Sequence, residues 1–365
     1  ITMFKNESKV IRRMLESCYE YIDYWVVQDN GSTDGTDQIV KDFFEEKGIP
    51  GHYYQCEEGW VGFGWNRDHL LQTCLNHDHG CDWILKMDCD EYLEVDDDFD
   101  WSLIDDTNIQ SFHITAENPG CTYYRAWMWN ARLPWHFKHD VAHECIVCDI
   151  EGVGEDFQRV NLPRGLRQMG TWDGESYATP TKYISDSLKL EEQHIREETL
   201  LSDTYHFWYV AKSYLDASYS PVFPLGYEQQ KEYARRAIFY FKSWMNHTID
   251  YDAKGYTGGV NEMAYYTLYC IGMMYQLMGD FEKAIESHML AEPFCDIRNE
   301  HIVGLAECYR DIGDFEGMKY QTERLVDPER KLPFPQCYFL VNNSFYIDSG
   351  NYGKELHQIA SENYK

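Results

Sequence analysis

Two aspartates, Asp88 and Asp90, stand two residues apart at the end of a short apolar segment and are followed by Glu91. Residues 83–87 have the length and composition of a buried strand, interrupted only by Lys86. Because residues two apart in an extended chain point the same way, both aspartates can face one site at the C-terminal end of the strand. Two hard carboxylate oxygens at this spacing suit Mg²⁺ or Mn²⁺ held jointly with a phosphate. Taken alone, the pattern also fits acidic residues that merely end a strand in an acidic protein.

A second polar segment lies earlier, at residues 28–36, and reads Gln-Asp-Asn-Gly-Ser-Thr-Asp-Gly-Thr. It follows a short apolar strand, and apolar side chains at helical spacing predict a helix over residues 36–46. The glycines permit a tight reversal, and Thr33 or Asp34 could cap the helix. Strand, loop and helix in this order form a mononucleotide-binding layout in which Asp29 can hydrogen-bond a base or ribose. The loop is neither a dinucleotide fingerprint nor a P-loop, and a plain β-turn is the alternative interpretation.

The elements around these two segments predict the fold class. Short apolar strands at residues 24–27, 52–55 and 83–87 alternate with helices that carry one apolar stripe each. This order predicts a largely parallel α/β sheet with helices on both faces, and ligands bind at the carboxyl ends of such strands. Arg67 stands near the start of the helix before the aspartate strand, where a guanidinium can bind diphosphate oxygens. A surface arginine paired with an acid is the alternative.

Four motifs occur in order and together resemble family 2 glycosyltransferases of the GT-A fold (a Rossmann-like α/β fold), which use nucleotide-sugar donors. They are Phe-Lys-Asn-Glu at residues 4–7, Asp-Asn-Gly-Ser-Thr-Asp-Gly-Thr at 29–36, Trp-Asn-Arg-Asp at 65–68 and Lys-Met-Asp-Cys-Asp-Glu at 86–91. The resemblance covers roughly the first 150 residues, and the combination is more specific than any one motif. Cys89 replaces the alanine that the family often carries between its aspartates, and Arg67-Asp68 stands where Arg-Asn is usual.

The resemblance implies a site for a nucleotide-sugar and a metal ion. The residues that it assigns to the nucleotide-sugar are Asn6, Glu7, Asp29, Asn30, Asp34, Arg67 and Asp88. It implies Mn²⁺ or Mg²⁺ on Asp88 and Asp90, and His143 would complete the metal shell with neutral imidazole. Alternatively, the His143-Glu144 pair acts through Glu144, which would deprotonate the acceptor hydroxyl. Asp173, in a loop rich in Gly, Thr and Asp, is a second candidate for this catalytic base.

Composition limits the possible partners and compartments. The net charge of −30 argues against a nucleic-acid partner, because neutralising phosphates requires clustered Lys and Arg. No apolar run approaches the roughly 18 residues of a membrane span, so we expect none. The 12 scattered cysteines indicate buried thiols rather than a disulfide framework, which favours a reducing compartment and a cytoplasmic location. Because the chain starts at Ile1, a targeting segment removed upstream stays an open alternative.

After about residue 180 the pattern changes to helices only, which predicts a catalytic domain over residues 1–180 and a helical domain over 181–365. The sequence Gly-Asp-Phe at residues 279–281 recurs at 313–315, a shift of 34 residues (from 279 to 313). This period is that of tetratricopeptide repeats, with one helix–turn–helix per repeat. We expect four such units, the last at residues 338–352, because each hairpin needs neighbours to bury its apolar face. Surplus apolar surface predicts a homodimer through the repeats.

These observations predict a metal-dependent transferase that moves a hexose from a UDP-sugar, with UDP-glucose the expected donor, to a hydroxyl of a protein, peptide or glycan acceptor. The resemblance favours inversion at the anomeric carbon. Two other classes stay open. A degenerate transferase fold whose repeats recruit partners would be a binding scaffold, but the retention of both aspartates argues against it. A nucleotidyltransferase can also use strand-end aspartates with a metal, but residues 1–12 lack the basic Gly-rich loop expected there.

Overall fold

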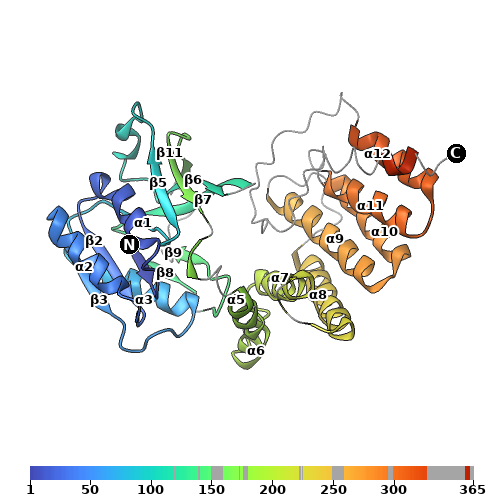
Figure 1. The fold of residues 1–365 in the computed structure, drawn as a ribbon, viewed down its shortest axis with the longest axis horizontal. Helices are drawn as coiled ribbons and strands as arrows, with labels where there is room; N and C mark the ends of the chain where they lie inside the picture. Colours follow the sequence, from blue (N-terminus) through green and yellow to red (C-terminus); the bar gives the residue numbers. More distant parts are fainter. Residues whose placement is uncertain are drawn as a thin grey trace. The chain divides into compact units, whose positions relative to one another are not determined.

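The structure is a computed structural model in which the chain divides into two compact units, Ile1–Ser187 and Leu188–Lys365. It describes residues 1–118, 121–138, 140–148, 159–171, 173–175, 180–221, 223, 225–248, 259–294, 299–326 and 358–361. Figure 1 shows that the first unit contains both strands and helices, whereas the second is helical. Helix α5 (Pro180–Ser187) belongs to the first unit, although the sequence places the domain boundary at residue 180.

Parallel strands at the start of the chain carry the polar loop. Strands β1 (Thr2–Phe4), β2 (Trp25–Asp29) and β3 (Gly51–Gln55) are joined through helices α1 (Ile11–Cys18) and α2 (Thr36–Lys47). The central strand is β2, and its Asp29 is paired in register with Phe4 on one side and Gln55 on the other. The three strands therefore end together, and the loop after Asp29 leaves the sheet at its carboxyl edge, as the sequence predicts.

A second, mixed sheet carries the aspartate motif. Its strands are β4 (Trp83–Leu85), β5 (Glu91–Val95), β6 (Ser111–Asn118), β7 (Cys121–Asn130), β10 (Arg159–Asn161) and β11 (Leu166–Gly170). Two backbone hydrogen bonds connect it to the first sheet, since Ile1 N donates to Leu85 O (2.6 Å) and Met87 N donates to Ile1 O (3.1 Å). This is the pattern of parallel pairing. Asp88 therefore leaves β4 at the same edge where Asp29 leaves β2.

Apolar packing on both faces of the sheet positions the remaining elements of the first unit. These elements are α3 (Phe63–Leu75) and the hairpin of β8 (Trp135–Phe137) and β9 (Ile146–Cys148). Successive residues of β2 point to opposite faces of the sheet and pack in different cores. Trp25 packs with α1 and α2, and Val26 packs with α3. Trp129 and Trp135 are buried in the same core as the apolar side chains of α3. The first turns of α3, with Arg67, are thereby fixed against the sheet.

The second unit is helical wherever the structure describes it. Its helices are α6 (Lys189–Arg196), α7 (Tyr205–Tyr219), α8 (Tyr227–Thr248), α9 (Gly259–Met278), α10 (Phe281–Ala291), α11 (Glu300–Asp311) and α12 (Phe315–Val326). Consecutive helices pack in pairs, α7 with α8, α9 with α10 and α11 with α12 (Figure 1). The sequence over residues 182–199 predicts one long helix. The structure instead has a break near Ser187, whose hydroxyl donates to Ile184 O (2.9 Å). Within the described ranges, no helix has the length and apolar character needed to cross a membrane.

The two turns that the sequence relates by the 34-residue shift have the same structure. Gly279 and Gly313 have φ angles of +78° and +79°, a left-handed conformation that glycine adopts without steric penalty. In both turns the next residue, Asp280 or Asp314, donates its N–H over 2.9 Å to the carbonyl of the tyrosine in the helix before. The period is therefore structural in these two hairpins. The tetratricopeptide assignment stays a prediction, and the fourth unit, expected at residues 338–352, lies outside the described residues.

His288 of α10 is buried between glycines of two neighbouring helices. A Cβ atom added to Gly272 of α9 or to Gly304 of α11 would lie 2.5 Å from the His288 ring. Neither ring nitrogen has a hydrogen bond in the part of the chain that the structure describes. Burial, and the neighbouring His301, lower the pKa of His288 to about 3.

We expect this ring to make the helical unit sensitive to acid. The unfolded chain binds a proton on His288 near pH 6.5, whereas the folded ring stays neutral down to about pH 3. Its contribution to the free energy of unfolding is therefore complete above pH 6.5 and is lost as the pH falls through this window, by about 2 kcal/mol at about pH 5. Denaturant unfolding at the two ends of this pH range measures the change in the free energy of unfolding. The wild type is compared with His288→Asn and with the exposed control His247→Asn. The same pH dependence in His288→Asn as in the wild type would contradict it.

Candidate active site

Asp29, at the end of β2, is built into the loop that follows it. Its Oδ1 accepts the N–H groups of Gly31 (3.0 Å) and Ser32 (2.8 Å), and its Oδ2 accepts the hydroxyl of Tyr53 (2.9 Å). The residue is 2 % exposed. The carboxylate therefore shapes the loop, and its expected contact with the nucleoside stays a prediction.

Asn6 and Asp34 hold the same loop against the start of α1 and α2. Asn6 has a left-handed φ of 60°, and its Oδ1 accepts the N–H of Thr33 (2.8 Å). Asp34 accepts the N–H groups of Ser8 (3.0 Å) and of Thr36 (3.1 Å), the first residue of α2. Burial alone would raise the pKa of Asp34, but the hydrogen bonds from Thr36 and Ser8 outweigh it and lower the pKa to about 2.

Asn30 connects the loop to the Trp-Asn-Arg-Asp motif of α3. Its Oδ1 accepts Nε2 of Gln28 (2.8 Å) and Nδ2 of Asn66 (2.9 Å), and the residue is 1 % exposed. Asn66 also donates to Gly59 O (2.8 Å). Two of the four motifs are therefore joined by buried amide hydrogen bonds. Asn30 is buried and fixes the loop relative to α3.

Asp88 is surrounded by cations of the protein itself. Lys86 Nζ lies 2.7 Å from Asp88 Oδ1, and Arg67 Nη2 lies 3.4 Å from the same oxygen. Lys86 is 2 % exposed, and its Nζ lies 3.4 Å from the ring centroid of Trp127. Burial opposes the ionisation of Asp88, but the charges of Lys86 and Arg67 outweigh it and hold its pKa below the usual range. Asp88 is thus an anion that already has its counter-charges.

Asp90 has the opposite environment, because its carboxylate forms no ion pair within the described ranges of the chain. Burial, together with the charges of Asp88 and Glu91, raises the pKa of Asp90 to about 6. Glu7 accepts the N–H of Glu175 (3.2 Å), and burial and the charge of Asp90 raise its pKa to about 7. Two carboxyl groups that repel each other and lack a cation form a site suited to a divalent ion.

Arg67 joins the aspartate motif to the His143-Glu144 segment. Its guanidinium forms an ion pair with Glu144, and the two side chains are 15 % and 7 % exposed. The structure therefore brings Arg67, Asp88 and Glu144 together, from three segments far apart in the sequence. His143 has a left-handed φ of 57°, which is uncommon for a residue other than glycine. The first unit, as far as it is described, holds no group of three potential ligands with their atoms together, so His143 as a ligand beside Asp90 stays a prediction.

A protein-family comparison supports one of the classes that these motifs suggest. The model for glycosyl transferase family 2 matches residues 1–99, which include Asp29, Arg67, Asp88 and Asp90. The first unit contains a family 2 glycosyltransferase domain. Its mixed sheet is that of the GT-A fold, and the helical region follows it in the chain. The match supports glycosyltransferase activity, and a comparison with curated proteins found no match to the chain.

In the glycosyltransferase domain, Asp173 is held by Arg13 of α1. Arg13 Nη1 and Nη2 donate to the two carboxylate oxygens of Asp173 (2.8 and 2.7 Å), and Nη2 also donates to Thr171 Oγ1 (2.6 Å). Hydrogen bonds from Arg13 lower the pKa of Asp173 to about 2. Such a carboxylate accepts a proton poorly, so its surroundings favour an anchoring role over that of general base.

Asp173→Asn tests this role. Its side chain is 46 % exposed, and an ion pair in such a setting contributes about 1 kcal/mol or less. We therefore expect kcat/KM to fall less than about tenfold, mainly through the KM of the acceptor. Steady-state kinetics with varied acceptor concentration measure kcat and KM of the variant. The control is Glu16→Gln, on the same helix α1 as Arg13. A fall in kcat of about a thousandfold at constant KM would instead make Asp173 the base.

Three further side chains lie beside the aspartate motif but are not among the site residues that the sequence predicts, namely Lys86, Arg125 and Trp127. Arg125 of β7 forms an ion pair with Glu91, and its Cζ lies 3.9 Å from the ring centroid of Trp127. Trp127 therefore has both Lys86 and Arg125 over its ring. A lysine inside an otherwise apolar strand is the signal that could have revealed Lys86. Arg125 carries no such signal, because its partner depends on how distant strands pair.

Proposed function

We propose that the chain transfers a hexose from a UDP-sugar to a hydroxyl group of a protein, peptide or glycan, with Mn²⁺ or Mg²⁺ as cofactor. The family match supports the transferase class. UDP-glucose is the first donor to test, on the resemblance of the motifs to family 2. The main support for a metal ion is the difference in charge environment between Asp88 and Asp90.

Asp88 has Lys86 and Arg67 as counter-ions, whereas Asp90 has none within the described residues. Asp90 and Glu7 offer hard oxygen atoms and uncompensated negative charge, which is the donor chemistry that Mn²⁺ and Mg²⁺ prefer. We therefore assign the metal first to Asp90, with Asp88 and His143 as the further candidate ligands. A bound ion would neutralise charge on the leaving diphosphate.

Arg67 and Glu144 supply the remaining groups of the proposal. Arg67 presents a planar guanidinium beside Asp88, and this geometry suits diphosphate oxygens. Glu144 is oriented by the same guanidinium, so the proposed base and the proposed diphosphate contact are neighbours. Both carboxylates that the sequence offers as base are paired with an arginine. We assign the role to Glu144 because its partner Arg67 also contacts Asp88 of the aspartate motif.

A donor screen tests the proposal without knowledge of the acceptor. UDP- and GDP-sugars are incubated with the chain in Mn²⁺, Mg²⁺ or a chelator, and release of the nucleoside diphosphate is measured. We expect slow hydrolysis of one UDP-hexose that requires the metal and is lost in Asp90→Asn, with Glu16→Gln unaffected. Equal hydrolysis in the chelator would remove the metal from the proposal. Pyrophosphate release from UTP and a sugar phosphate would favour the nucleotidyltransferase alternative.

The homodimer and the cytoplasmic location stay predictions. Large apolar side chains are exposed on the second helix of each pair, at Phe239 of α8, Met289 of α10 and Tyr320 of α12. These are side chains that the proposed interface on the helical unit would bury.

A further inference from the structure

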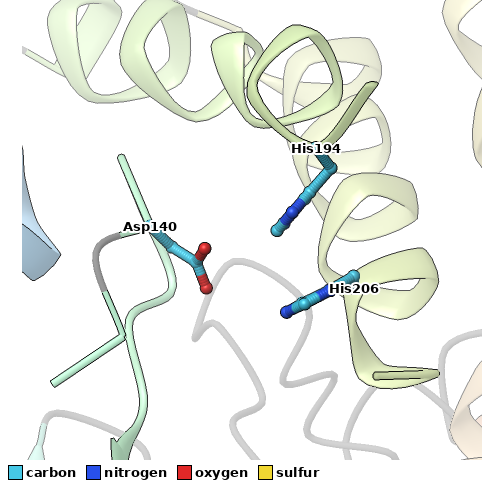
Figure 2. A group of neighbouring side chains, drawn as sticks. All are labelled: Asp140, His194 and His206. Atoms are coloured by element: carbon cyan, nitrogen blue, oxygen red, sulfur yellow. The ribbon is translucent and has the colours of Figure 1, made fainter. Parts of the chain in front are cut away.

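Two histidines of the helical unit face each other across the turn between α6 and α7. His194 of α6 and His206 of α7 are 1 % and 7 % exposed. Their rings stack, with centroids 4.0 Å apart and an angle of 23° between the ring planes. Figure 2 shows the two side chains next to each other. Ring nitrogens of the two histidines approach within 4.8 Å of each other. Asp140, which Figure 2 also labels, belongs to the first unit.

Thr199, in the turn between the two helices, holds both rings. His194 Nδ1 lies 2.8 Å from Thr199 Oγ1, and His206 Nδ1 lies 2.7 Å from Thr199 O. A carbonyl oxygen only accepts hydrogen bonds, so Nδ1 of His206 carries the proton. In the neutral ring, Nε2 of His206 therefore presents a lone pair, and it has no hydrogen-bond partner among the described residues.

This arrangement is one that metal-binding histidines use. A hydrogen bond from one ring nitrogen to a protein oxygen fixes the tautomer and orients the other nitrogen toward the ion. A buried ring nitrogen without a partner is costly, and two stacked imidazoles that both took up a proton would repel each other. A cation bound to both rings removes these penalties together.

We propose that His194 and His206 form a binding site for a transition-metal cation of the zinc type. Imidazole nitrogen suits Zn²⁺, Co²⁺, Ni²⁺ and Cu²⁺, whereas Mg²⁺ and Mn²⁺ prefer oxygen ligands. The site therefore differs in chemistry from the carboxylates at Asp90, and it does not depend on the proposed transferase function. A bound ion would join α6 to α7 and stabilise the beginning of the helical unit.

A second histidine pair in the chain supplies an internal comparison. The rings of His52 and His77 have centroids 4.2 Å apart but are tilted by 44°. Unlike the other pair, neither ring has a hydrogen bond in the described ranges that would fix its tautomer. Proximity of two imidazoles is thus common to both pairs, and the orientation by Thr199 is particular to His194 and His206.

The test is a titration of the tag-free, full-length chain with Zn²⁺ after removal of metals by a chelator. Calorimetry measures affinity and stoichiometry, and the visible absorption of added Co²⁺ reports nitrogen coordination. We expect one site that weakens at least about tenfold in His194→Gln and in His206→Gln. His77→Gln and Asp90→Asn should leave the affinity unchanged.

Thr199→Val keeps both imidazoles and is the alternative test of the site if a histidine variant does not fold. It removes the oxygen that orients His194, so we expect Zn²⁺ binding to weaken about tenfold, with helix content unchanged by circular dichroism. The proposal is overturned if the wild type binds no Zn²⁺, or if His206→Gln binds Zn²⁺ as tightly as the wild type does. Loss of the site in His77→Gln would assign the ion to the other pair and overturn it equally.

Discussion

Asp90→Asn is expected to reduce transfer about a thousandfold, equivalent to about 4 kcal/mol of lost transition-state stabilisation. The amide keeps the shape of the side chain but removes the negative charge that lacks a counter-ion in the described structure. UDP should then bind with the same affinity in the presence and absence of Mn²⁺, whereas the wild type should bind it more tightly with the metal. Because the pKa of Asp90 is raised to about 6, protons should compete with the metal below this pH. Calorimetry with UDP, with and without Mn²⁺, measures the effect.

Asp88→Asn is the informative partner of this experiment. It leaves the buried ammonium of Lys86 without its closest carboxylate, which is 2.7 Å away in the wild type. We therefore expect Asp88→Asn to lower the free energy of unfolding by about 3 kcal/mol, while Asp90→Asn leaves it nearly unchanged or raises it. Equal UDP affinity of the wild-type chain with and without Mn²⁺ would contradict the assignment of the metal to Asp90.

Local patterns predict the positions of the main site residues because they lie at strand ends. The apolar run before Asp88 and the glycine-containing loop after Asp29 place both segments at the carboxyl edge, and β2 and β4 confirm this. The same patterns say little about which side chains are free to meet a ligand. Asp29 has the residue type of a nucleoside contact, yet its Oδ1 binds within the loop and its Oδ2 accepts the hydroxyl of Tyr53 on β3.

Contacts between distant segments determine the rest of the site. Arg67 meets Glu144 because α3 packs beside the segment that leads from β8 to β9, and no spacing within either segment encodes this. Arg125 of β7 pairs with Glu91, the first residue of β5, and no spacing within either strand encodes this ion pair. The division of roles between Asp88 and Asp90 depends on these cations, so the motif alone cannot show it.

Gly64→Ala is expected to destabilise the glycosyltransferase domain by about 3 kcal/mol or more and to reduce transfer at least about tenfold. An added Cβ would overlap the carbonyl oxygen of Lys138 and lie 2.7 Å from Asp140 N. These are backbone atoms, which cannot turn aside as the end of a flexible side chain can. The Gly64 N–H also donates to Asp140 O (3.0 Å), so this contact joins the first turn of α3 to the segment before Glu144. A displaced segment would separate Glu144 from Arg67.

Gly62→Ala is the matched control, two positions earlier in the chain. Its φ of 172° is extended backbone that any residue adopts, and its added Cβ would lie 3.5 Å from Val141 Cα, an ordinary contact. We expect it to change the free energy of unfolding by about 1 kcal/mol or less. Chemical unfolding, and kinetics at a temperature where both variants are folded, separate lost stability from lost geometry. If Gly64→Ala unfolds and transfers as Gly62→Ala does, the close approach of α3 to Lys138 and Asp140 does not position Glu144.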